Sequence, residues 1–271
     1  MTIGLDAELF DKRSLLFLPA SNPRAIARAR ASAADLVILD LEDAVKPADK
    51  AAARAAAVEA IAEDWPMAVA IRINGSASEW HGADLAAMSA SRVKLVVVPR
   101  ASSAAEIETI GAALDRPVAA MIETAAGVLA APDIARTAAA LVAGTNDLSA
   151  DLKLPPDAGR RPLQAALQWI VLAARAAGVA AFDGVFNRLD DPEGLDAECA
   201  ESRLLGFDGK SLIHPDQIEA CHWAFAPSAE EVGRAERLLA AASGGAERFE
   251  GAMVEGMHVA AARRLLERAG R

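Results

Sequence analysis

Cysteine is scarce in this sequence, where Cys199 and Cys221 are the only two. Neither lies in a CxxC motif, and neither has a histidine at the spacing of a metal ligand. We therefore expect two reduced, partly buried thiols, because a disulfide framework or a zinc site needs more cysteines in a tighter pattern.

Long apolar runs and positive charge are also in short supply. The longest apolar runs fall well short of the ~20 residues of a membrane span. The first residues, MTIGLDAELFDKRS, lack the apolar centre of a signal peptide, so none is expected. With 38 acidic and 28 basic residues, the net charge of −10 argues against nonspecific nucleic-acid binding and favours a soluble cytoplasmic protein.

Several common catalytic motifs are missing. GxSxG, HExxH, Walker A and a GxGxxG that follows a strand do not occur. Serine-hydrolase, zinc-protease and P-loop functions therefore have no support.

What the chain does have is a series of short apolar segments separated by helical stretches. They are Ser14–Ala20, Asp35–Asp43, Val69–Asn74, Lys94–Arg100, Pro117–Thr124, Ala140–Leu148, Ala180–Asn187 and Gly209–Pro215. Several are almost continuously apolar, as expected of parallel strands buried on both faces. Eight strands alternating with helices predict a TIM (β/α)8 barrel over residues 1–227. A doubly wound open sheet is the alternative, because periodicity does not distinguish a closed sheet from an open one.

The residues after 227 predict a C-terminal helical extension, 228–271. Ser228–Ala242 and Met257–Ala269 read as helices, and Ser243–Gly245 as a flexible break between them. This extension would serve as a lid, as an oligomer contact or as plain packing.

Polar side chains gather at the carboxyl ends of the predicted strands. They are Asp40, Glu42, Asp43, Arg72, Asn74, Arg100, Glu123, Asn146, Asp147 and His214. In a closed barrel these ends share one rim, where barrel enzymes carry their active sites. Lys94 and Lys210 lie at the opposite, starting ends, which argues against a Schiff-base aldolase.

Glu123 and Asp147 are the candidate metal ligands. Each ends a predicted strand, and the two strands are neighbours in the barrel. Two carboxylates completed by water and substrate oxygens suit Mg²⁺, although a rim carboxylate is about as often a salt-bridge partner.

Arg72 lies within an apolar strand and needs a partner. It would grip a substrate carboxylate with its planar fork, or form a structural ion pair with Asp40 or Glu42. Strand alternation places Asp40 and Glu42 on one face and Asp43 on the other, where these acids would orient metal-bound water or hold Arg72. His214, alone at a strand end, is more typical of a structural residue.

Six segments together resemble the citrate lyase β-subunit and malyl-CoA lyase family of the HpcH/HpaI aldolase group. They are RSLLFLPASNPR (13–24), DLVILDLEDAV (35–45), AIRIN (70–74), MIETAAGV (121–128), GTNDLSADL (144–152) and GFDGKSLIHPDQI (206–218). They occur in the family's order and span most of the chain from Arg13 to Ser228. Each motif alone is modest, but the ordered set is specific.

The resemblance implies a Mg²⁺-dependent barrel enzyme that cleaves or forms a 3-hydroxyacyl-CoA thioester. The products would be a 2-keto acid and an acyl-CoA, with Mg²⁺ on Glu123 and Asp147. Arg72 would bind the keto-acid carboxylate, and Glu123 would also touch the substrate. Arg13 and Asn74 are further candidate substrate-binding residues. A homotrimer or homohexamer is also expected from the resemblance.

Three positions depart from the family pattern, one of which, AFDGV (181–185) where AIDGV is usual, is a packing variation. GAMVEG (251–256) places Glu255 where the family has a lid aspartate that handles protons and comes from a neighbouring subunit. Arg100 stands where many relatives have lysine. Two other functions stay open: a metal-dependent aldolase acting on free acids without CoA, and a non-catalytic homologue.

Overall fold

The computed structural model describes residues 8–243 and 245–270. The stretch 1–7, part of the segment that suggested the absence of a signal peptide, and Gly244 of the predicted break lie outside the described residues. The chain divides into two compact units, one ending at Ala224 and the other beginning at Phe225. The division expected from the sequence was between residues 227 and 228.

The first unit is a closed barrel of parallel strands. They are β1 (Ser14–Pro19), β2 (Leu36–Asp40), β3 (Ala68–Arg72), β4 (Val96–Val98), β5 (Val118–Ile122), β6 (Ala140–Ala143), β7 (Ala180–Asp183) and β8 (Gly209–Leu212). Each strand pairs with the next, and β8 pairs with β1 through Ser14 and Lys210. The predicted TIM barrel is confirmed, and the open sheet is excluded because the sheet has no edge.

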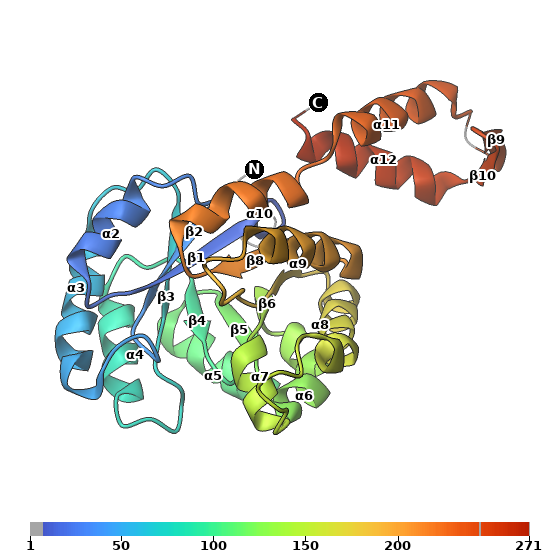
Figure 1. Cartoon of the computed structure of the whole chain (residues 1–271). Coiled ribbons are helices and arrows are strands. Elements are labelled where there is room, and N and C mark those ends of the chain that lie inside the picture. Colours follow the sequence, from blue (N-terminus) through green and yellow to red (C-terminus); the bar gives the residue numbers. More distant parts are fainter. Residues whose placement is uncertain (1–7, 244, 271) are drawn as a thin grey trace. The chain divides into compact units, whose positions relative to one another are not determined.

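Helices surround the strands of this unit (Figure 1). The α-helices are α2 (Pro23–Arg30), α3 (Lys50–Ala62), α4 (His81–Ala90), α5 (Ala104–Leu114), α6 (Ala125–Ala135), α7 (Thr145–Asp151), α8 (Gln164–Ala177), α9 (Pro192–Leu205) and α10 (Ile218–Phe225). Short 3₁₀ turns η1 (Pro47–Asp49), η2 (Arg161–Leu163) and η3 (Pro215–Gln217) precede α3, α8 and α10. Asn22 accepts from the Ala25 amide ahead of Pro23, which explains why α2 begins there.

Apolar side chains from alternating strand positions fill the barrel interior. Ile38, Val97, Val142 and Phe182 are almost fully buried there, together with Met121 nearer the carboxyl end. Layers of branched side chains of this kind make a barrel a packed core and leave the carboxyl-end rim for chemistry.

The second unit contains two helices and a hairpin. Helix α11 (Ala229–Ala241) is followed by β9 (Glu247–Phe249), β10 (Ala252–Val254) and α12 (Gly256–Arg268), with β9 and β10 antiparallel. Ala235, Leu238, Val254 and Ala262 form its small core. Both predicted helices are present, whereas the hairpin between them was not anticipated.

Across residues 8–243 and 245–270, none of the helices is both long and apolar enough to cross a membrane. Cys199 and Cys221 are buried free thiols, as expected.

Candidate active site

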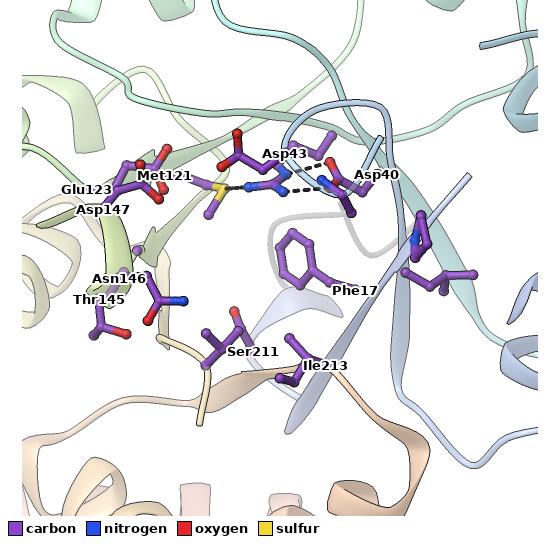
Figure 2. Close-up of a pocket in the computed structure, with 17 residues that line it drawn as sticks. Phe17, Asp40, Asp43, Met121, Glu123, Thr145, Asn146, Asp147, Ser211 and Ile213 are labelled. Atoms are coloured by element: carbon purple, nitrogen blue, oxygen red, sulfur yellow. Dashed lines mark hydrogen bonds and ion pairs between the residues drawn. The ribbon is translucent and has the colours of Figure 1, made fainter. Parts of the chain in front are cut away.

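A pocket of about 390 Å³ opens at the carboxyl end of the barrel strands (Figure 2). Residues from β1, β2, β3, β5, β6 and β8, and from the segments that follow the strands, including the one after β7, line it. They are Phe17, Leu18, Pro19, Asp40, Asp43, Ala44, Arg72, Met121, Glu123, Ala143, Gly144, Thr145, Asn146, Asp147, Val185, Ser211 and Ile213. The pocket thus unites Glu123, Asp147, Arg72, Asp40 and Asp43, as the shared-rim argument anticipated.

Glu123 directly follows β5 and is almost completely buried. Its Oε1 accepts the backbone N–H of Arg100 at 2.6 Å. Arg100 holds a left-handed backbone with φ of 50°, which lets its amide point at this carboxylate. Gly144 on the neighbouring strand end leaves space for the rest of the side chain, because a Cβ there would collide with Oε2 and Cβ of Glu123.

Burial raises the pKa of Glu123 to about 7. The Arg100 amide and Arg72 lower it, but the charges of Asp147 and Asp43 add to the rise. Several carboxylates close together, with too little positive charge among them, form a site whose ionised state a divalent cation would stabilise.

Asp147 lies in the first turn of α7 and not at a strand end as predicted. Strand β6 stops at Ala143, and Gly144 becomes the residue that precedes the helix. Asp147 still reaches the pocket beside Glu123 (Figure 2). Its Oδ1 accepts from Nη1 of Arg100 at 3.1 Å.

Glu123 and Asp147 fit a magnesium ion by their chemistry. Both offer carboxylate oxygens to the same pocket, Glu123 directly after β5 and Asp147 from the first turn of α7 after the neighbouring strand β6. Among the described residues, no three His, Cys, Asp or Glu side chains converge as a metal cage. Mg²⁺ suits such a half-built site, since it commonly uses one or two carboxylates and completes its octahedron with water and substrate oxygens.

Arg72 forms ion pairs with two acidic side chains and also lines the pocket. Its Nε and Nη2 donate to the two oxygens of Asp40 at 2.7 and 2.6 Å, and Nη1 lies 2.8 Å from Glu42 Oε2. Burial would lower the pKa of Arg72, but Asp40 and Glu42 outweigh that effect and raise the pKa above its ordinary value. The ion pair considered from the sequence is therefore present, and it fixes the guanidinium at the pocket wall.

The three acids at the end of β2 and just after it, Asp40, Glu42 and Asp43, are arranged differently from the predicted alternation. Because β2 ends at Asp40, the next residues form a turn, and Asp40 and Asp43 line the pocket while Glu42 does not. Glu42 makes its ion pair with Arg72 outside the lining of the pocket. Burial raises its pKa to about 7, although Arg72 acts in the opposite direction.

Two candidate substrate-binding residues lie away from the pocket. Arg13 precedes β1 at the amino end of the barrel and makes a two-point ion pair with Asp35 at 3.0 Å. Asn74 is buried, accepts from Lys50 Nζ at 2.6 Å and donates to Asp84. Both side chains are already engaged in structural contacts outside the lining of the pocket.

Glu255 and His214 have local roles in their own segments. Glu255 belongs to the second unit and directly precedes α12. Its side chain is exposed, and its backbone N–H donates to His258 Nδ1 at 3.0 Å. His214 accepts from the Asp216 amide at the start of η3, in keeping with the structural role expected for it.

Sequence reasoning did not identify the uncharged part of the pocket lining. Phe17, Met121, Thr145, Ser211 and Ile213 all line the pocket. The sequence carried no signal for Ser211: only the structure shows Lys210 buried against Asp183 and Glu198 on the outer face of β8, which places the next residue on the opposite face, toward the barrel interior.

The closed eight-stranded barrel with two carboxylates and a buried arginine at its rim defines a TIM-barrel protein of enzyme type. Residues 13–215 match the model of the HpcH/HpaI aldolase/citrate lyase family. The chain belongs to this family.

Named relatives agree along nearly the whole chain. A (3S)-malyl-CoA thioesterase of Cereibacter sphaeroides is 41% identical over 272 residues, covering 95% of this chain and 94% of the relative. A citrate lyase subunit beta-like protein of Deinococcus radiodurans is 36% identical, covering 94% and 96%.

Solved structures show the same fold with ligands bound. CitE from Mycobacterium tuberculosis in complex with magnesium, acetoacetate and coenzyme A has a TM-score of 0.86 and 36% identity, covering 96% of this chain and 98% of that chain. The citrate lyase β subunit of the same organism with oxaloacetate and magnesium has a TM-score of 0.74 and 36% identity, covering 81% and 100%.

Proposed function

We propose that this chain is a Mg²⁺-dependent carbon–carbon lyase that cleaves or forms a 3-hydroxyacyl-CoA thioester of the malyl, citramalyl or citryl type. The products of cleavage are a 2-keto acid and an acyl-CoA. The observation that carries this proposal is the convergence of Glu123, Asp147 and Arg72 on one pocket. Similarity to proteins solved with magnesium, keto acids and coenzyme A supports it.

Glu123 and Asp147 would hold the metal. When bound, Mg²⁺ polarises the oxygen on the carbon that becomes the keto carbon, and it neutralises the negative charge gathered at this rim. Arg72 supplies the positive charge that would bind the carboxylate of the keto-acid half of the substrate. Because Asp40 already fixes its fork through Nε and Nη2, the guanidinium is oriented before substrate arrives and the remaining Nη hydrogens can meet a substrate carboxylate.

The cleavage step breaks the bond between the α-carbon of the thioester and the hydroxyl-bearing carbon. The hydroxyl gives its proton to a carboxylate of the pocket rim acting as base, its carbon becomes the keto carbon, and the electron pair of the broken bond passes to the thioester as an enolate. The enolate then takes a proton at its α-carbon. We assign this proton transfer to Glu255 of the C-terminal unit, the carboxyl group at the family's lid position.

Hydrolysis of the same thioester is a second candidate function. It is favoured by the 41% identity to (3S)-malyl-CoA thioesterases over 95% of this chain. Both reactions use the same hydroxyacyl thioester, but they break different bonds. Hydrolysis cuts the bond between the acyl carbon and sulfur, and it releases a hydroxy acid and free CoA.

Product analysis separates the two reactions. Malyl-, citramalyl- and citryl-CoA are each incubated with the protein, with and without Mg²⁺, and free citrate serves as the control lacking CoA. A lyase produces a 2-keto acid and acyl-CoA without free thiol, whereas a thioesterase produces free thiol without keto acid. Absence of both products on all three thioesters, or turnover of free citrate alone, would contradict the proposal.

We also propose that the chain works as a cytoplasmic homotrimer or homohexamer. The second unit has a small apolar core of its own. A unit of this size gains stability by packing against another protein surface, such as a second copy of the chain. A monomer in light scattering at micromolar concentration would refute this assembly.

A further inference from the structure

Ser211 occupies an unusual position in the pocket. It is the third residue of β8 and is almost fully buried, with 2% of its surface exposed. Its neighbour Lys210 points outward, to Asp183 at 2.8 Å and Glu198 at 2.7 Å. Strand alternation therefore turns Ser211 inward, where it lines the pocket (Figure 2).

The hydroxyl of Ser211 has no hydrogen-bond partner among the described residues. Buried hydroxyls are normally paired, because leaving one unpaired loses its interaction with water without replacement. The other strongly buried polar groups of the pocket are engaged: Asp40 and Arg72 with each other, and Glu123 with the Arg100 amide.

Ser211 has apolar neighbours on its own side of the pocket and carboxylates on the opposite side. Phe17 and Ile213 lie beside it in the pocket wall, and neither carries a polar side-chain atom (Figure 2). Glu123 and Asp147 lie across the pocket, on the side of β5 and β6, which are three and two strands away from β8 around the barrel. Ionised carboxylates only accept hydrogen bonds, whereas a hydroxyl also donates. Ser211 therefore supplies a donor on the wall that faces the candidate metal ligands.

We propose that the Ser211 hydroxyl is a substrate-binding group that donates a hydrogen bond to an oxygen of the keto-acid half of the substrate. This inference rests on the proposed function, because it takes the pocket to be the keto-acid site. A substrate oxygen accepts the hydrogen bond that the hydroxyl does not make inside the protein. A ligand with an oxygen next to Ser211 is therefore bound in preference to a ligand without one.

The test measures keto-acid binding to the full chain. Glyoxylate, pyruvate and oxaloacetate are each titrated by calorimetry into wild type, Ser211→Ala and Ser211→Cys with Mg²⁺ present. Loss of one hydrogen bond should weaken the tightest of these ligands about 3- to 10-fold in both variants. Ser211→Cys nearly preserves the side-chain volume, so a parallel loss follows the hydroxyl and not a cavity. Mg²⁺ affinity should stay at the wild-type value.

A matched control and a stability measurement complete the experiment. Ser91→Ala removes a buried hydroxyl outside the pocket that donates to the Met88 carbonyl, and it should leave keto-acid affinity unchanged. Thermal unfolding of Ser211→Ala without ligand should occur at the wild-type temperature or above it, since an unpaired hydroxyl is removed. A lower unfolding temperature would show that the hydroxyl is already satisfied inside the protein, and would overturn the inference.

The outcomes also separate this inference from the proposed function. If wild type binds no keto acid in the presence of Mg²⁺, the keto-acid site itself is refuted. If wild type binds one and both Ser211 variants bind it equally well, the site stands and only the role of Ser211 is refuted.

Discussion

The Glu123 side chain occupies space that residue 144 leaves free because it is glycine. A Cβ at position 144 would overlap both Oε2 and Cβ of Glu123. The glycine and the carboxylate stand at the ends of neighbouring strands, β6 and β5, which pair through Ile122 and Ala143. The position of the buried acid therefore depends on the missing side chain beside it.

Gly144→Ala should displace Glu123 and weaken Mg²⁺ binding by about tenfold or more, the range seen when residues that orient metal ligands are changed. Gly82→Ala is the matched control, because a Cβ at Gly82 in α4 meets no atom within 4 Å. It should leave Mg²⁺ affinity unchanged and stabilise the helix by up to about 1 kcal/mol. Calorimetry with Mg²⁺ on both variants checks this, and equal affinities would contradict it.

Removing either candidate metal ligand should abolish Mg²⁺ binding. Glu123→Ala and Asp147→Ala each take away one of the two candidate metal ligands, and in the part of the chain that the structure describes no group of three or more His, Cys, Asp or Glu side chains could hold the ion instead. Asp133→Ala, which removes an exposed acid paired with Arg136, should bind Mg²⁺ like wild type. If both ligand variants bind Mg²⁺ normally in calorimetry, the metal site lies elsewhere.

Arg72→Lys should weaken keto-acid binding roughly tenfold or more, because the ammonium keeps the charge but loses the planar fork. Arg13→Lys is the comparison, since Arg13 makes a similar two-point pair with Asp35 at the amino end of the barrel. It should leave keto-acid affinity intact and cost at most about 1 kcal/mol of stability, because the pair is partly exposed. A loss of keto-acid affinity in Arg13→Lys would mean that Arg13 does bind the substrate.

Stability without metal should depend on pH through Glu42. Burial raises its pKa from 4.5 to about 7, so between these values the folded protein holds a proton that the unfolded chain has released. The unfolding free energy from this group therefore falls as pH rises from about 4.5 to 7, and the stabilisation is lost above that range. Glu42→Gln, which cannot ionise, should gain stability relative to wild type between pH 5 and pH 8.

Denaturant unfolding at pH 5, 6, 7 and 8 measures this difference between the two proteins. Glu63→Gln is a suitable control because Glu63 is an exposed partner of Arg30 at the end of α3. A constant difference between wild type and Glu42→Gln across the range would mean that Glu42 titrates near its ordinary pKa.

Glu255→Gln should reduce turnover by about 10²- to 10⁴-fold if the carboxyl group protonates the enolate. Mg²⁺ and keto-acid binding should survive, because neither uses this residue. Glu255→Asp should preserve or raise activity toward the family's thioesters, since it restores the family's residue. Wild-type turnover in Glu255→Gln, on a thioester that the enzyme cleaves, would identify Glu255 as an exposed acid without a catalytic role.

Local sequence determined the strands of the barrel and most of the polar residues that follow them. Each strand is a short apolar run with polar residues directly after it, so the strand ends and the residues that follow them were readable one segment at a time. The positions of Glu123, Arg72 and Asp40 at the pocket followed from that reading, because parallel strands in a closed barrel place their carboxyl ends together.

Tertiary structure alone decided which of these side chains meet and in what surroundings. Arg13 and Asn74 belong to the same kinds of motif as Arg72, but their partners Asp35 and Asp84 hold them outside the pocket lining. Ser211 looked like an ordinary strand residue until closure of the barrel placed it in the pocket wall. Local periodicity determines the face to which a side chain turns, but contacts between distant segments determine its partners, its burial and hence its pKa.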